Sequence, residues 1–247
     1  MDSGNVAVSG DVSLTTDANN GVINLGTLQQ SGGDLILTTN GTGDATVVNN
    51  AAIDLGASNV GGALSATASA GTITQNGGAL TVAGTSAFTT STADQAITLS
   101  NTANALTGAV SLTTSGTAGH VTIDNGTTAL GVQGTVSGDF ALTSGEALTD
   151  SAALSVTGPT TVTTDVADKT SPLDDLASTG GGRLTTQRAP EADQGAADQT
   201  TSNCQPVLLD WMLSRTLFEG HPALVQLLLH ISHGCVLAVY NVMLCGA

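Results

Sequence analysis

The chain has 247 residues, of which 40% are hydrophobic, only 2% are aromatic and 31 are glycine, and its formal net charge is −16. All four Lys and Arg residues lie at Lys169 or later, so residues 1–168 are acidic and carry no base. Such a surface repels phosphate backbones and argues against nucleic acid as a partner, and the scarcity of aromatic side chains argues against an ordinary globular core.

The first predicted elements belong to a repeat. Val6–Thr16, VAVSGDVSLTT, recurs as LTVAGTSAFTT at Leu80–Thr90 and again, at the same interval, as LSVTGPTTVTT at Leu154–Thr164. Gly33–Gly56 recurs as Gly108–Gly131, at an interval one residue longer. Self-similarity at a fixed period indicates a repeat architecture, here with a long repeat of about 75 residues.

Within each long repeat, short runs alternate between apolar and polar residues, as in Val6-Ala7-Val8 and Leu35-Ile36-Leu37. Alternation with period two, interrupted by Gly, Asn and Asp, predicts short strands joined by turns. A strand with one or two apolar side chains is stable only beside a parallel neighbour, so residues 1–168 are predicted to coil into a stacked β-solenoid.

The repeat alignment predicts which residues face the core, pairing Leu35 with Val110 and Val48 with Ile123. Polar pairs such as Asn49-Asn50 are predicted either to stack as ladders in neighbouring coils or to lie in solvated turns. The repeat allows two coil lengths, because a long repeat divides into four coils of roughly 19 residues or three of roughly 25 residues.

The string ITQNGGALTVAGTSAFTTSTADQAITLSNTANALTGAVSLTTSGTAGHVTIDN, Ile73–Asn125, resembles the repeat region of filamentous-haemagglutinin-like adhesins, the bacterial exoproteins of two-partner secretion, and of related autotransporter passengers. The resemblance covers about residues 5–168. It implies a right-handed parallel β-helix and a structural or adhesive role outside the cell, with host or neighbouring-cell surface molecules or matrix as partners. No export signal follows Met1, so we expect that signal to lie upstream.

The repeat pattern fails after Thr164. Residues 169–206 are polar and predict a flexible linker. Residues 207–247 form an apolar tail whose first part, VLLDWMLSRTLF, has helical spacing. This tail is predicted to be a short α-helical cap on the solenoid, a membrane-associated segment or sequence unrelated to the repeats. Any membrane contact is expected through the tail alone.

Catalysis is not expected. Residues 1–168 contain no Lys, Arg, Trp or Tyr, so they lack both the bases and the aromatic platforms that sugar-cleaving β-helices use. No phosphate loop, nucleophile elbow or dinucleotide fingerprint is present. We therefore predict no catalytic and no cofactor-binding residues.

A calcium-dependent extracellular matrix or surface-layer scaffold is the alternative function, and a non-functional fragment of a longer adhesin is a second alternative. Calcium would use turn carboxylates, for which the candidates are Asp11, Asp17, Asp34, Asp44, Asp54, Asp124 and Asp139. In the tail, His230, His233 and Cys235 are weak zinc candidates, because their spacing fits no standard finger and helix packing explains them more simply.

An uncapped first coil leaves backbone hydrogen-bonding groups without a neighbouring strand, so end-to-end self-association is predicted.

Overall fold

A computed structural model describes residues 4–164, 176–178 and 184–188. The chain divides into two compact units, Met1–Thr201 and Ser202–Ala247, and all described residues belong to the first. Throughout these ranges the regular structure is β-strand, the strand pairing is parallel and no helix occurs. The prediction of an all-β parallel solenoid is therefore confirmed, whereas the predicted tail lies outside the described residues.

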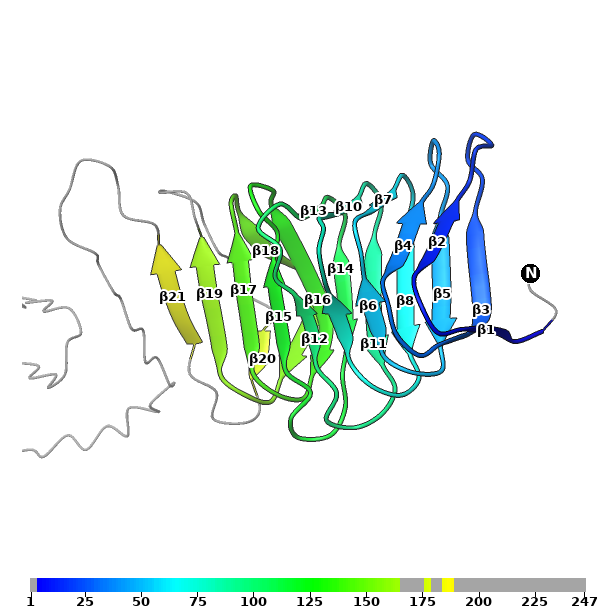
Figure 1. Cartoon of the computed structure of the whole chain (residues 1–247). Helices are drawn as coiled ribbons and strands as arrows, with labels where there is room; N and C mark the ends of the chain where they lie inside the picture. Colours follow the sequence, from blue (N-terminus) through cyan, green and yellow to red (C-terminus); the bar gives the residue numbers. More distant parts are fainter. Residues whose placement is uncertain (1–3, 165–175, 179–183, 189–247) are drawn as a thin grey trace, which may run out of the picture. The chain divides into compact units, whose positions relative to one another are not determined.

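Two sheets form the walls of the solenoid (Figure 1). Sheet A contains, in stacking order, β1 (Val6–Val8), β3 (Ile23–Gln30), β5 (Ala45–Asn49), β8 (Leu64–Ala68), β11 (Ser86–Thr90), β14 (Val110–Thr113), β16 (Leu130–Val136), β18 (Leu148–Val156) and β20 (Leu176–Ser178). Sheet B contains β2 (Val12–Thr15), β4 (Leu35–Thr38), β6 (Ile53–Leu55), β9 (Ile73–Gln75), β12 (Ile97–Leu99), β15 (Val121–Asp124), β17 (Phe140–Ser144), β19 (Thr160–Thr164) and β21 (Leu184–Arg188). From β4 a side branch of sheet B continues through β7 (Ser58–Val60), β10 (Leu80–Val82) and β13 (Ala105–Leu106).

The coils vary in length. Between β1 and β18 the chain makes seven turns. The coil that runs from Leu130 to Leu148 contains fewer residues than the coil that runs from Ser86 to Val110. Neither predicted coil length therefore holds throughout. The solenoid also continues into the segment predicted as a linker, because β20 and β21 pair with β18 and β19.

The long repeat corresponds to three and a half coils rather than three or four. In the alignment that places Val6 on Leu80, β1 of sheet A matches β10 of sheet B, and β2 of sheet B matches β11 of sheet A. In the alignment that places Gly33 on Gly108, β4 of sheet B matches β14 of sheet A. Consecutive copies of the repeat thus occupy opposite sheets, which is possible because both sheets use the same kind of strand and turn.

Alternate residues of each strand point inward and form one continuous core. Val47, Ala66, Phe88 and Leu112 occupy paired positions on four successive strands of sheet A, and all four are fully buried. Burial of one such large aliphatic or aromatic side chain stabilises the fold by about 1.5–3 kcal/mol. Because most strands contribute only one or two of them, stability depends on unbroken stacking.

The core prediction at Val48 is wrong. Val47 is fully buried, whereas Val48 lies on the outer face of β5. When the inward residues of β5 and β15 are matched, Val47 corresponds to Ile123 and Asn49 to Asn125. One extra residue in the turn before β15 produces this shift. An ungapped alignment hides it, and a one-residue slip exchanges the inner and outer faces of a strand.

The recurrent Thr-Thr pair has a structural role at the end of the strands. The second threonine points inward, and its hydroxyl donates a hydrogen bond to a carbonyl across the following turn. Thr39 donates to Gly43 at 2.7 Å after β4 in sheet B, and Thr114 donates to Gly119 at 2.8 Å after β14 in sheet A. The same bond therefore closes turns on both sheets, which lets one repeat sequence serve either face.

Two buried hydroxyls of the described residues, Ser86 Oγ and Thr160 Oγ1, have no hydrogen-bond partner. Thr160 Oγ1 is buried and makes no hydrogen bond. Val12 occupies the matching position two repeats earlier. We expect Thr160→Val to raise the free energy of unfolding by about 1–2 kcal/mol, because the change removes an unsatisfied hydroxyl and keeps the side-chain shape. Equilibrium urea unfolding measures the difference.

Thr114→Val is the matched control, since the same chemical change there removes the hydroxyl that donates to Gly119. It should destabilise the protein by about 1–3 kcal/mol. If the two variants changed the free energy of unfolding by the same amount and in the same direction, the Thr160 hydroxyl would not differ from the Thr114 hydroxyl in lacking a hydrogen-bond partner.

Candidate functional site

Two loops at matching repeat positions join neighbouring coils through a short polar side chain. Asn20 Oδ1 accepts hydrogen bonds from the backbone N–H of Thr42 (2.8 Å) and from its hydroxyl (2.9 Å). Asp94, the counterpart of Asn20 in the next repeat, accepts from the backbone N–H groups of Thr117 (2.6 Å) and Ala118 (2.8 Å). Asn20 and Asp94 have φ values of 59° and 62°, a left-handed conformation that Asn and Asp tolerate better than most residues.

A glycine completes each of these loops. Gly41 and Gly116 precede Thr42 and Thr117 and have φ values of 64° and 90°. A Cβ atom on Gly116 would lie 2.7 Å from the backbone nitrogen of Asp94 and closer still to its carboxylate. Glycine is therefore required for the Thr117 N–H to reach the preceding coil. This explains why the Gly-Thr pair is retained in both copies of the repeat.

Acid should weaken one of these two loops and not the other. The backbone hydrogen bonds from Thr117 and Ala118 hold the pKa of the exposed Asp94 carboxyl below its ordinary value of 3.8. Just below that value Asp94 binds a proton in the unfolded chain but not yet in the folded chain. The stability that the ionised Asp94 carboxylate contributes is therefore present above about pH 4 and is lost as the pH falls through the lowered pKa. We expect Asp94→Asn to remove this part of the acid sensitivity.

Asparagine is a suitable replacement because Asn20 already occupies the matching loop and accepts the same type of bond. The measurement is the melting temperature of the wild-type protein and of Asp94→Asn between neutral pH and about pH 2. The two curves should converge or cross in the acidic part of this range. Curves that stay parallel over the whole range would contradict the prediction.

Five of the seven calcium candidates lie in turns, whereas Asp54 lies within β6 and Asp124 ends β15. Asp11, Asp44 and Asp124 each accept a backbone N–H at 2.7–2.9 Å, and Asp54 accepts the Thr74 hydroxyl at 3.1 Å. The other three, Asp17, Asp34 and Asp139, lie between strands. Among the described residues, no group of three or more His, Cys, Asp or Glu side chains is arranged to hold a metal ion. Several of these carboxylates instead bond to a neighbouring coil.

The candidates in the tail, His230, His233 and Cys235, lie outside the described residues. So does the apolar segment that could contact a membrane. In the part of the chain that the structure describes, no helix has the length and apolar character to cross a bilayer.

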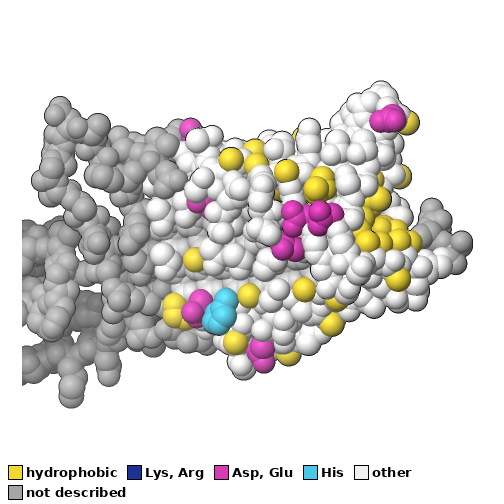
Figure 2. All heavy atoms as spheres, in the orientation of Figure 1, with side chains coloured by type: hydrophobic (Ala, Val, Ile, Leu, Met, Phe, Trp, Pro, Cys, Tyr) yellow, Lys and Arg dark blue, Asp and Glu magenta, His cyan; other side chains and the backbone are white. Residues whose placement is uncertain are grey.

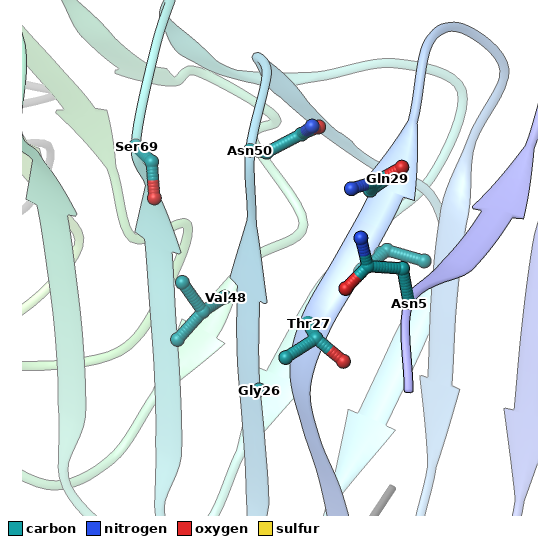
Figure 3. Close-up of a pocket in the computed structure, with 8 residues that line it drawn as sticks. Asn5, Gly26, Thr27, Gln29, Val48, Asn50 and Ser69 are labelled. Carbon is teal, nitrogen blue, oxygen red and sulfur yellow. The ribbon is translucent and has the colours of Figure 1, made fainter. Parts of the chain in front are cut away.

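A shallow hollow of about 200 Å³ lies on the outer face of sheet A, beside a register shift between β3 and β5 (Figure 3). Gly26 and Thr27 fall within this shift, and the missing side chain of Gly26 leaves the hollow open. The polar residues that line it are Asn5, Thr27, Gln29, Asn50 and Ser69. Amides and hydroxyls can hydrogen-bond a neutral polar ligand, but the lining residues include no acid or base to transfer a proton.

A second hollow, of about 350 Å³, lies on the outer face of sheet B. His120 Nδ1 accepts the backbone N–H of Asp139 at 2.9 Å and lies 3.6 Å from Asp139 Oδ2. Both side chains are about half exposed or more. The lining residues include no second carboxylate, lysine or cysteine. The pair therefore acts as a link between coils, and its surroundings do not supply the groups of a hydrolytic site.

Sheet A carries a row of hydroxyls along its outer face. Thr67, Thr89, Thr113 and Thr135 occupy paired register positions on β8, β11, β14 and β16. Parallel strands are about 4.8 Å apart, so the hydroxyls repeat at that spacing. The face shown in Figure 2 carries acidic side chains, several of them gathered near the middle of the stack, among uncharged polar and small apolar ones, and its described residues show no cluster of Lys or Arg. This hydroxyl row extends over four successive strands of sheet A.

A family model described as repeats of unknown function (DUF5649) matches residues 42–113 and 118–187. Together these segments make up more than half of the chain. The chain belongs to the DUF5649 repeat family. The first DUF5649 segment begins just before β5 of sheet A, and the second begins just before β15 of sheet B. One DUF5649 repeat therefore fills three and a half coils.

No curated protein and no solved structure matches the chain. Sequence reasoning missed Asp94 and His120 as contributors to coil contacts. A usable signal existed for Asp94, because Asn20 and Asp94 are separated by the 74-residue interval of the long repeat. Thr42 and Thr117 match in the same way after a shift of one residue.

Proposed function

We propose that this chain is a non-catalytic structural and adhesive segment of a large secreted or cell-surface bacterial exoprotein, of the filamentous-haemagglutinin-like or autotransporter-passenger type. The supporting observation is the core, which runs from β2 to β19 without a break and leaves only shallow hollows on the outer faces of the described coils. Such a stack suits a stiff spacer that presents its lateral surface. The proposal includes a right-handed coil, the hand favoured by parallel strand crossovers.

The hydroxyl row on sheet A is the surface that we propose contacts host or neighbouring-cell molecules or matrix. Hydroxyls hydrogen-bond neutral ligands such as glycans without requiring charge. The row is continuous over four coils, whereas the matching positions of sheet B, Thr98, Thr122, Ala141 and Thr161, are interrupted by alanine.

Adhesion of coated beads tests this proposal. Beads carrying the full chain are applied to cultured epithelial cells and to mucin- and collagen-coated surfaces, beside albumin-coated beads. The variant T89K/T113K places two bulky cations on the row, and T98K/T122K places the same two changes on sheet B. We expect several-fold fewer beads retained with T89K/T113K and unchanged retention with T98K/T122K. Retention of the unmodified chain no greater than that of albumin would overturn the adhesive role and favour a non-functional fragment.

The calcium-dependent scaffold is the second candidate, and one observation favours it. Asp11, Asp34 and Asp54 directly precede or lie within paired strands of three successive coils, where Val12 pairs with Leu35 and Leu35 with Leu55, although no three carboxylates of the described residues are grouped as a metal site. Calcium should then raise the melting temperature of the chain relative to a chelator, and Asp34→Asn should abolish the increase. An unchanged melting temperature would remove this candidate.

A further inference from the structure

A third hollow, of about 210 Å³, lies at a corner where the chain passes from sheet A to sheet B. It is bordered by the turn 31–34, which joins β3 to β4, and by the turn 50–52 of the next coil, which joins β5 to β6. The first turn is one residue longer than the second, so the two turns do not stack residue on residue. The polar side chains that line the hollow are those of Gln30, Ser31, Asp54 and Thr74.

Gln30 presents an unbonded oxygen to this hollow. The residue is only 3% exposed, and its backbone N–H and carbonyl both bond to the side chain of Asn49. Its Nε2 donates to the carbonyls of Gly10, Gly33 and Asp34 at 3.0–3.2 Å. Its Oε1 accepts no hydrogen bond from any described residue. Because every other polar group of Gln30 is bonded to the protein, Oε1 is the group that it offers to the hollow.

The other buried amides of the described residues show that Gln30 is an exception. The side-chain oxygens of Asn49, Asn104 and Asn125 each accept a backbone N–H at 2.7–2.8 Å. Buried polar atoms of native proteins nearly always have a hydrogen-bond partner, and those that lack one within the protein are satisfied by water, an ion or a ligand. The Gln30 oxygen therefore indicates a place for a hydrogen-bond donor from outside the protein.

The same hollow contains negative charge. Asp54 Oδ1 accepts the Thr74 hydroxyl at 3.1 Å, and Asp54 Oδ2 accepts no hydrogen bond within the described residues. Asp34 and Asp54 directly precede Leu35 and Leu55, which are register partners, so a second carboxylate neighbours the first along the stack. Residues 1–168 contain no Lys or Arg, so any organic cation that pairs with these carboxylates comes from outside that region.

We propose that this hollow, here called the corner site and defined by Gln30, Ser31, Ala52 and Asp54, binds a primary alkylammonium group. The group is carried by a lysine side chain of another protein or by a free polyamine. An ammonium group has three N–H donors, and the site offers three kinds of acceptor in Gln30 Oε1, the Asp54 carboxylate and the Ser31 hydroxyl. Ala52 adds apolar surface for the methylene groups that carry the charge.

A divalent metal ion matches the corner site less well. Calcium takes six to eight oxygen ligands, and no three acidic, histidine or cysteine side chains of the described residues are grouped to hold a metal ion. The corner site also includes no residue of the hydroxyl row on sheet A. The proposal is therefore independent of the adhesive role of that row, and either can fail without the other.

Nuclear magnetic resonance of the isotope-labelled full chain tests the proposal. The probe is a glycine peptide with blocked ends and a single central lysine, and the same peptide with acetylated lysine is the control for charge. We expect the lysine peptide to shift the amide signals of Gly33, Ala52, Asp54 and the Gln30 side chain in a saturable manner, whereas the acetylated peptide leaves them in place. Spermidine is titrated in parallel. Tighter binding of spermidine identifies a free polyamine as the ligand, and tighter binding of the peptide identifies a lysine side chain.

Three variants locate the binding. Asp54→Asn should raise the dissociation constant of the lysine peptide at least about tenfold, because it removes the charge while an amide oxygen can still accept the Thr74 hydroxyl. Ala52→Leu should weaken binding by a similar factor, because it fills the hollow and keeps every charge. Asp17→Asn is the matched control, since it removes the same charge from an exposed turn outside the site and should change the dissociation constant by less than about twofold.

The melting temperature of each variant shows whether it is folded. The absence of saturable shifts with both the lysine peptide and spermidine would overturn the proposal. So would equal weakening by Asp54→Asn and Asp17→Asn, because a general attraction of cations to the acidic surface would then explain the shifts. Unchanged binding in Ala52→Leu would place the ammonium group outside the corner site and would overturn it as well.

Discussion

Replacing Phe88 by alanine is expected to lower the free energy of unfolding by about 3–5 kcal/mol, the usual cost of removing a buried phenyl ring. Phe88 is fully buried on β11, between Ala66 on β8 and Leu112 on β14. Ala66 is too small to fill the space that the ring leaves, so a cavity would remain in the middle of the stack. Because each coil contacts only its neighbours, the cavity also weakens the coupling between the two halves of the solenoid.

Equilibrium urea unfolding followed by circular dichroism measures the loss. Thr89→Ala, on the next residue and the outer face of the same strand, is the control and should cost about 1 kcal/mol or less. The same loss in both variants would contradict a core that lies between the two sheets.

The sequence predicted the solenoid because the long repeat recurs at nearly the same interval, although individual residues differ between its copies. Alternating runs, turn residues and the regular recurrence of the long repeat all favour stacked parallel strands. The number of coils in a repeat could not be predicted in the same way. The strand Val12–Thr15 in sheet B has the same pattern as Ser86–Thr90 in sheet A. A threonine hydroxyl closes the turn after each of them, from Thr16 in the first case and from Thr90 in the second. Nothing within a strand therefore identifies its sheet.

The polar contacts were harder to predict for a related reason. Each joins one coil to the next, but the separation in sequence differs from contact to contact. The Leu106 N–H bonds to Asn125, 19 positions away, whereas the Ala118 N–H bonds to Asp94, 24 positions away. Partners across coils consequently cannot be found from a fixed offset. The carboxylate of Asp94 could be predicted to lie in a turn, but its bonds to the next coil depend on a register that only the structure supplies.

The buried asparagines give the sharpest test of that register. Asn125 is fully buried, accepts the Leu106 N–H at 2.7 Å, and donates to the carbonyls of Leu106 at 3.2 Å and Ala129 at 2.8 Å. Asn125→Ala leaves these three backbone groups without a partner in a region that excludes water. We expect the free energy of unfolding to fall by at least about 2–3 kcal/mol in urea unfolding.

Asn50 is the residue that sequence identity pairs with Asn125, yet it is exposed. The structural counterpart is Asn49, which is fully buried, accepts the Gln30 N–H at 2.8 Å and donates to the Gln30 carbonyl at 3.0 Å. Asn49→Ala should therefore match the loss of Asn125→Ala, and Asn50→Ala should change stability by about 0.5 kcal/mol or less. If Asn50→Ala cost as much as Asn125→Ala, the one-residue shift before β15 would be wrong, and the strands would stack in the register of the ungapped repeat.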